Sequence, residues 1–112
     1  MTREDRQEWL ECDVADLAPG SCRYIAHEAR SVLLVRLADG ALRAYDGLCS
    51  HALLPLDGAR VRRGAIMCPH HGARFECGSG DALGPPASAG LTPLELKEDD
   101  GQGEGQVKVL IA

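Results

Sequence analysis

The sequence predicts an all-β domain, and three observations support this fold class. Short segments alternate apolar and polar residues with the period of two that half-buried strands show. Thirteen glycines and six prolines in 112 residues suit a loop-rich β protein better than a helical bundle. No segment gives a convincing amphipathic helix. We therefore expect short antiparallel strands that are joined by turns.

Four strands are expected in the first half of the chain. The strongest candidate is Ser31–Leu37, because it is an apolar run of β-forming residues. Ala38-Asp39-Gly40 follows it and has the composition of a hairpin turn. These strands should form a meander that leads to Cys49. The four expected strands cover residues 9–14, 21–26, 31–37 and 41–45.

Five shorter strands are expected in the second half. Ala65–Met67 should deliver Cys68 into a loop, and the last two strands should form a hairpin around a polar, glycine-rich turn at 99–105. The expected strands cover residues 58–64 (a strand with its turn), 65–67, 73–76, 94–98 and 106–111.

Length and charge limit the class of protein. A chain of 112 residues predicts a single domain, 1–112. The net charge of −5 argues against nucleic acid as the main partner. The N-terminus lacks an apolar core, and no apolar run reaches the length of a membrane helix. We expect a cytoplasmic, soluble monomer with no membrane partner.

Two Cys and two His with mixed spacing are the most informative motif. Cys49 and His51 form C-x-H, sixteen residues follow, and Cys68 and His71 form C-x-x-H. Two thiolates and two imidazoles are the ligands of a Rieske 2Fe–2S centre, in which the thiolates hold one iron and the imidazoles hold the other.

Tetrahedral zinc is the alternative for the same four residues. Zinc fingers usually pair Cys with Cys and His with His, and a helix carries the His pair. Here each loop mixes one Cys with one His, and Pro69 and Gly72 disfavour a helix. The pattern therefore favours the iron–sulfur centre, although a zinc-stabilised interaction module remains an alternative.

The residues around these ligands resemble the Rieske family. The segment Cys68–Phe75 (CPHHGARF) is similar to the family's second cluster loop, C-P-x-H-G-x-x-F, and Gly78–Ala87 resembles the glycine turn and Gly-Pro-Pro loop that follow it. The resemblance is tightest from Tyr45 to Leu94. It implies an antiparallel β-sandwich or barrel as the base domain, about 1–45 and 88–112, with an inserted cluster-binding subdomain at about 46–87.

The resemblance also implies roles for the four ligands and their neighbours. Cys49 and Cys68 should hold the inner iron of one Rieske-type 2Fe–2S cluster per chain, and His51 and His71 should hold the outer iron near the surface. Gly72 should allow a close approach and should donate its N–H to a cluster sulfur. Pro85 and Pro86 resemble the loop that shields the cluster.

Two absences indicate which kind of Rieske protein the chain resembles. High-potential members have a disulfide between the cluster loops, at the positions of Leu54 and His70, and place hydroxyls at those of Ala73 and Phe75. Hydroxyl donors to sulfur raise the potential. Their absence predicts a potential toward the low end of the Rieske range, roughly −150 mV rather than +300 mV.

This combination resembles the ferredoxins of ring-hydroxylating dioxygenase systems. The resemblance implies an electron carrier, not an enzyme by itself, with a flavoprotein reductase as donor and a terminal oxygenase as acceptor. Only His27 and His70 remain to build a mononuclear iron site, which argues against an oxygenase subunit. The alternative is a Rieske-type small subunit of a larger oxidoreductase such as nitrite reductase.

Several other residues have simpler interpretations. His70 should be an exposed loop residue and Cys77 a bystander. Cys12 and Cys22 should be buried, reduced thiols. Arginines near the loops would either steer an acidic partner or, as the simpler interpretation, form a solvated turn. These arginines are Arg60, Arg62, Arg63 and Arg74.

Overall fold

The computed structural model describes residues 8–28, 30–49, 54–70, 72–84, 89–98 and 105–111. Nine strands and no helix lie within these residues, so none of the described elements is a helix long and apolar enough to cross a membrane. The all-β prediction is confirmed, and each expected strand is present with small shifts at its ends. The strands are β1 (Trp9–Asp13), β2 (Ser21–His27), β3 (Arg30–Arg36), β4 (Leu42–Asp46), β5 (Arg60–Arg62), β6 (Ala65–Met67), β7 (Arg74–Glu76), β8 (Leu96–Glu98) and β9 (Gln106–Leu110).

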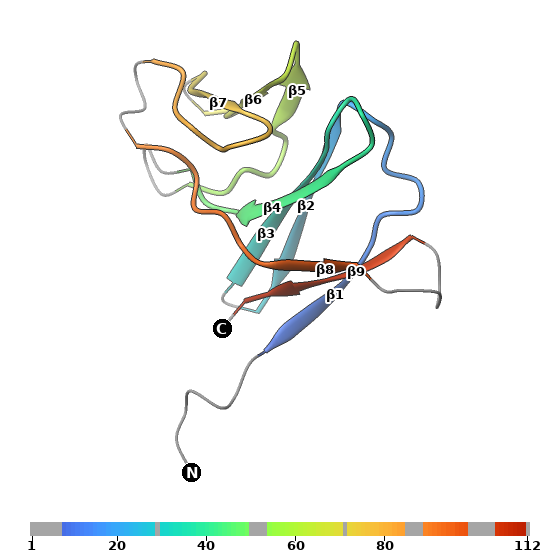
Figure 1. Cartoon of the computed structure of the whole chain (residues 1–112). Coiled ribbons are helices and arrows are strands. Elements are labelled where there is room, and N and C mark those ends of the chain that lie inside the picture. The colour runs from blue at the N-terminus through green and yellow to red at the C-terminus, as the bar shows by residue number, and fades with distance from the viewer. Residues whose placement is uncertain are drawn as a thin grey trace.

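The described strands form three antiparallel sheets of three strands each (Figure 1). The first is the predicted meander β2-β3-β4. The second has the order β1-β9-β8, so that the first described strand pairs with the last, with Cys12 opposite Val107. The third is β5-β6-β7, which lies at the end of the molecule away from β1 and β9. β5-β6-β7 and the segments around it carry the predicted ligands.

Strand β3 separates the two buried clusters of the core. Leu33 and Val35 belong to the cluster that includes the residues of β6 and β7, whereas Val32 and Leu34 belong to the one that includes β1 and β9. Successive side chains of a strand point to opposite faces, and all four of these are fully buried. The apolar run is therefore continuous because both faces of its sheet are covered.

Hydrogen bonds connect the meander to the sheet β5-β6-β7. The Tyr45 hydroxyl donates to the carbonyl oxygen of Cys77 at 2.7 Å, and the thiol of Cys22 donates to the Ala59 carbonyl oxygen at 3.4 Å. Gly80 lies against the Tyr45 ring with φ +80°, and a Cβ there would be 2.8 Å from Cε1 of the tyrosine. These contacts fix the start of β5 and the end of β7 on the meander.

Candidate metal centre

The two cysteines of the motif begin loops that are closed in the same way. Cys49 follows β4 and Cys68 follows β6. The Cys49 N–H donates to the carbonyl oxygen of Leu54 at 2.8 Å, and the Cys68 N–H donates to that of Ala73, also at 2.8 Å. In both loops the acceptor lies five residues after the cysteine, so each hydrogen bond closes a loop with the same number of residues. The motif thus corresponds to two similar loops.

The two predicted histidine ligands lie within these loops in the sequence. His51 and His71 are outside the described residues. Within the described part of the chain, no three His, Cys, Asp or Glu side chains are grouped to hold a metal ion.

Both cysteines of the motif are buried beneath the loops. Cys49 is 0% exposed and Cys68 is 3% exposed, and both belong to one buried cluster with Leu56, Ile66 and Phe75. Two buried sulfur donors at the start of adjoining loops suit the inner iron of a cluster, since thiolates are its usual ligands. The donor set therefore fits a Rieske-type group, in which the predicted histidine ligands follow each cysteine in the sequence.

A hydrogen bond joins the second loop to the first. Nε2 of His70 lies 2.9 Å from the carbonyl oxygen of Pro55, and Pro55 in turn pairs with Leu48 through a β-bridge. The carbonyl can only accept, so Nε2 of His70 is the donor of this bond. His70 is exposed, as the sequence predicts, but it also connects the two loops.

Gly72 lies in the loop of Cys68 and closes its second half. Its N–H donates to the Cys68 carbonyl oxygen at 3.2 Å. No described atom comes within 4 Å of the position a Cβ would take, but φ is +74°. This left-handed backbone angle favours glycine, and the close approach of Gly72 to a cluster sulfur stays a prediction.

Cys77 is too far from Cys68 to share a cluster with it. The pairing of β6 with β7 places Ala65 opposite Glu76, and the Cys77 N–H donates to the Gly64 carbonyl oxygen at 2.9 Å. Cys77 therefore lies beside Gly64, at the end of β6 opposite to Cys68. Four residues of strand separate these ends, a distance of about 13 Å.

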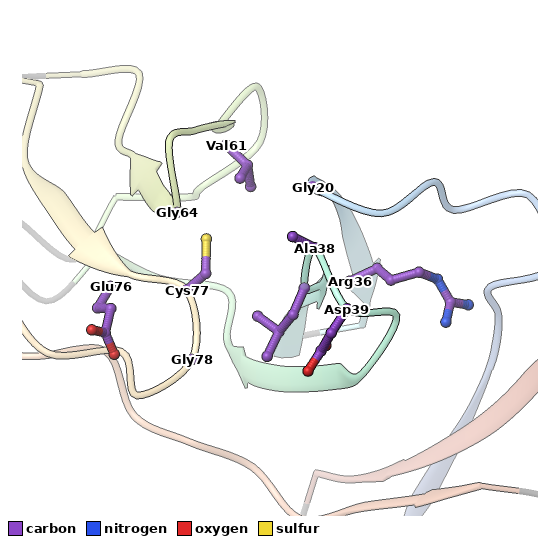
Figure 2. A pocket seen from close by; sticks show the side chains of 10 residues that line it. Gly20, Arg36, Ala38, Asp39, Val61, Gly64, Glu76, Cys77 and Gly78 are labelled. Carbon is purple, nitrogen blue, oxygen red and sulfur yellow. The ribbon is translucent and has the colours of Figure 1, made fainter.

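The Cys77 side chain points into a hollow between the β3–β4 turn and the β5–β6 turn (Figure 2). Burial, followed by the neighbouring Glu76 carboxylate, raises the pKa of its thiol. Both effects disfavour the thiolate that a metal requires, which agrees with the prediction that Cys77 is a bystander.

Cys12 and Cys22 are free thiols in different parts of the core; Cys12 is buried as predicted, whereas Cys22 is only half-buried. Cys12 belongs to the cluster of β1 and β9, whereas Cys22 packs against the cluster beneath the loops. Burial raises the pKa of both thiols, and Cys77 raises that of Cys22 further. They form no disulfide with each other.

The positions that carry hydroxyls in high-potential Rieske proteins are apolar here. Ala73 and Phe75 are each 0% exposed and pack in the cluster that contains Cys49 and Cys68. The nearby Tyr45 hydroxyl is already bonded to the Cys77 carbonyl oxygen. These three side chains therefore offer no hydroxyl donor to a cluster sulfur.

The sequence did not predict the roles of His70 and Tyr45. Both side chains bond to backbone carbonyl oxygens of residues distant in the sequence, Pro55 and Cys77. A backbone acceptor has no residue type, so no pattern in a single sequence could have identified either contact. Pro85 and Pro86 of the predicted shielding loop lie outside the described residues.

Comparison with known proteins gives consistent relatives. The ferredoxin component of the alkene monooxygenase system of Xanthobacter autotrophicus is 31% identical, over 88% of this chain and 81% of that protein. Apoptosis-inducing factor 3 of Homo sapiens is 33% identical over 84% of this chain, which spans only 15% of that longer protein.

A solved structure and a family model also match this chain. A chain in the complex of reduced oxygenase and oxidized ferredoxin in carbazole 1,9a-dioxygenase superposes with a TM-score of 0.75 at 27% identity, and the match covers 94% of each chain. The family model for the Rieske [2Fe-2S] domain matches residues 7–96. The matched region contains both cysteine loops and eight of the nine strands in whole or in part. The chain belongs to the Rieske [2Fe-2S] domain family.

Proposed function

We propose that this protein is a one-electron carrier that passes electrons from a flavoprotein reductase to a terminal oxygenase of the aromatic-ring-hydroxylating type. The observation that carries the proposal is the pair of similarly closed loops, each starting at a buried cysteine, Cys49 or Cys68. Relatives that are named as ferredoxin components support it, as does the carbazole dioxygenase complex, in which an oxygenase is the partner.

The four motif residues are proposed as the complete ligand set. Cys49 and Cys68 supply buried thiolates for the inner iron, and His51 and His71 supply imidazoles for the outer iron. When bound, the 2Fe–2S group accepts and releases single electrons. The chain contributes two loops. Each is closed by a hydrogen bond from the N–H of its cysteine, Cys49 to Leu54 O and Cys68 to Ala73 O, and His70 Nε2–H···O Pro55 joins one loop to the other.

The chain is proposed to divide in two functional parts. Residues of about 46–87 contain both loops and the sheet β5-β6-β7, and they would bind the cluster. The remaining parts, about 1–45 and 88–112, contain the other two sheets and would act as the base. The sheet order is compatible with this division, because among the described strands none of β5-β6-β7 pairs with a strand of another sheet.

The protein is further proposed to be a cytoplasmic monomer without a nucleic-acid or membrane partner. The net charge of −5 supports the exclusion of nucleic acid. The substrate chemistry would belong to the oxygenase.

Reductive titration of the holoprotein tests the function. We expect one electron to be taken up per two irons. The reduced protein should then pass this electron to a surrogate acceptor, the oxygenase of carbazole 1,9a-dioxygenase, and its reduced-state EPR signal should disappear. A protein that contains the cluster but cannot reduce this oxygenase or cytochrome c would contradict the carrier function.

A further inference from the structure

The outer face of the sheet β5-β6-β7 carries arginines in adjacent rows. Strand pairing aligns Arg60, Met67 and Arg74 in one row across the sheet, and Arg62 with Ala65 and Glu76 in the next. Side chains of residues i and i+2 share a face, so both rows project to the same side.

The opposite side of this sheet faces the core. Val61, Ile66 and Phe75 form the intervening row; Ile66 and Phe75 are fully buried in the cluster with Cys49 and Cys68, and Val61 packs against it. The arginine side is therefore the solvent side. We call its three arginines, Arg60, Arg62 and Arg74, together with Arg63 of the turn after β5, the arginine face, because Arg63 lines the same hollow as Arg62 and Arg74. All four residues are exposed.

The side chains of the arginine face form no ion pair within the described residues. In the described part of the chain, none of its four side chains takes part in an ion pair or a side-chain hydrogen bond. By contrast, Arg23 pairs with Asp16 at 2.7 Å, and Arg36 donates to three backbone carbonyl oxygens. Residues 58–75 contain these four arginines and no acidic residue, although the chain as a whole has a net charge of −5. Glu76 is the one carboxylate in the two rows.

The arginine face is continuous with the loop of Cys68. Arg62, Arg63, Arg74 and Leu83 line a hollow of about 350 Å³ together with Met67. A second hollow shares Met67 and is lined by Arg60, Cys68 and Pro69. Leu83 is 43% exposed, so an apolar contact lies among the arginines. The positive surface thus reaches the site where the cluster would be held.

We propose that the arginine face docks an acidic surface of the protein that exchanges electrons with this one. The inference rests on the proposed electron-carrier function and names the chemistry of the partner's surface. Guanidinium groups bind carboxylates with two parallel hydrogen bonds, and Leu83 and Met67 supply an apolar centre. Because the rest of the chain is acidic, an acidic partner is repelled in other orientations, and the charge distribution steers it to the loop of Cys68.

Binding to an acidic polypeptide tests the surface without depending on electron transfer. The probe is immobilised poly-L-glutamate at low ionic strength, and the variants of the holoprotein are Arg62→Glu and Arg74→Glu. The matched control is Lys108→Glu, which makes the same change in net charge at an exposed position of β9, in a different sheet. We expect each arginine variant to bind about fivefold more weakly and the control to change by much less. No binding by the parent protein, or equal loss in all three variants, would overturn the proposal.

Electron exchange with small complexes tests whether the same face lies on the electron route. The reduced holoprotein is oxidised in stopped flow by the anion ferricyanide or by the cation tris(phenanthroline)cobalt(III). We expect Arg62→Glu and Arg74→Glu to slow the first reaction and accelerate the second, relative to Lys108→Glu. If all three variants respond alike, the face does not guide exchange and the proposal fails. If the purified protein cannot be loaded with iron but still binds poly-L-glutamate through Arg62, the docking surface is supported and the carrier function is contradicted.

Discussion

His70 and Pro55 are joined by a hydrogen bond of 2.9 Å, from Nε2 of the histidine to the carbonyl oxygen of the proline. His70 stands at one of the two positions that hold the bridging disulfide in high-potential Rieske proteins, and Pro55 follows Leu54, which stands at the other. This chain therefore has a non-covalent connection between its loops near the place of that covalent one.

Removal of this connection should loosen the loops. We expect His70→Ala to lose iron to a chelator about two- to tenfold faster, because one hydrogen bond between the loops is lost. His70→Gln keeps an N–H donor and should retain most of the parent's rate. The measurement is the rate of cluster bleaching in excess chelator. Equal rates in all three proteins would show that the hydrogen bond does not hold the loops.

Cys77 and Cys68 should differ sharply when each is replaced by alanine. Cys77→Ala should keep the full iron content, because Cys77 lies at the far end of β6 from the Cys68 loop, with a fall of about 1 kcal/mol in the free energy of unfolding. Cys68→Ala should lose the cluster. Iron analysis and the visible spectrum distinguish the two, and a cluster-free Cys77→Ala protein would refute the ligand assignment.

Tyr45 should make the protein sensitive to alkali. Burial raises the pKa of its hydroxyl to about 12 from an ordinary value of 10. Below pH 10 the Tyr45 hydroxyl is neutral in both the folded and the unfolded state, so the free energy of unfolding is unaffected. Between pH 10 and 12 the hydroxyl ionises in the unfolded state first, so the free energy of unfolding falls as the pH rises. The loss should be on the order of 2 kcal/mol.

Denaturant titrations at pH 9 to 12 measure this effect. Tyr45→Phe should remove the additional loss in that window, although it costs about 1–3 kcal/mol at neutral pH by leaving the Cys77 carbonyl oxygen without its donor. Tyr24→Phe, on strand β2 of the same sheet, is the control and should keep the loss. An identical pH dependence in both variants would exclude Tyr45 as its source.

Alanine substitutions at two glycines with positive φ distinguish the cost of backbone strain from the cost of a steric clash. Gly40 has φ +95° and open space at its Cβ position, whereas Gly80 has φ +80° and the Tyr45 ring at 2.8 Å. We expect Gly40→Ala to lower the free energy of unfolding by about 1–2 kcal/mol and Gly80→Ala to cost about 1–3 kcal/mol more. Thermal and urea unfolding give both values, and equal costs would contradict the close packing on Tyr45.

The reduction potential should lie near the low end of the Rieske range, at roughly −150 mV. Ala73→Ser adds a hydroxyl close to Cys68 and should raise the potential. Ala41→Ser adds one at the end of β4 remote from Cys49 and should leave it unchanged. Redox titration followed by visible circular dichroism measures both. A potential near +300 mV in the parent would show that another donor replaces the missing hydroxyls.

The strands could be predicted from the sequence because each depends on a local pattern. The alternation in Gln106–Leu110 and the apolar run within Arg30–Arg36 report burial on one or two faces directly. The pairing of β1 with β9 could not be predicted, because it depends on which edges remain free after the meander has formed.

Within the site, the sequence indicated residue types but not hydrogen bonds. The motif identified Cys49 and Cys68, which the structure places in one buried cluster beneath two similar loops. It did not indicate the contact of His70 with Pro55 or the positive φ of Gly72. These features depend on backbone geometry, which residue types encode only weakly.

We propose that the two cysteine loops hold a Rieske 2Fe–2S centre. Low-temperature EPR of the dithionite-reduced protein, with iron, zinc and sulfide counted on the same sample, tests it most directly. We expect two irons and two sulfides per chain and a rhombic signal with an average g below that of all-cysteine ferredoxins. An EPR-silent sample with one zinc and no sulfide would contradict the account and would establish a zinc-stabilised module instead.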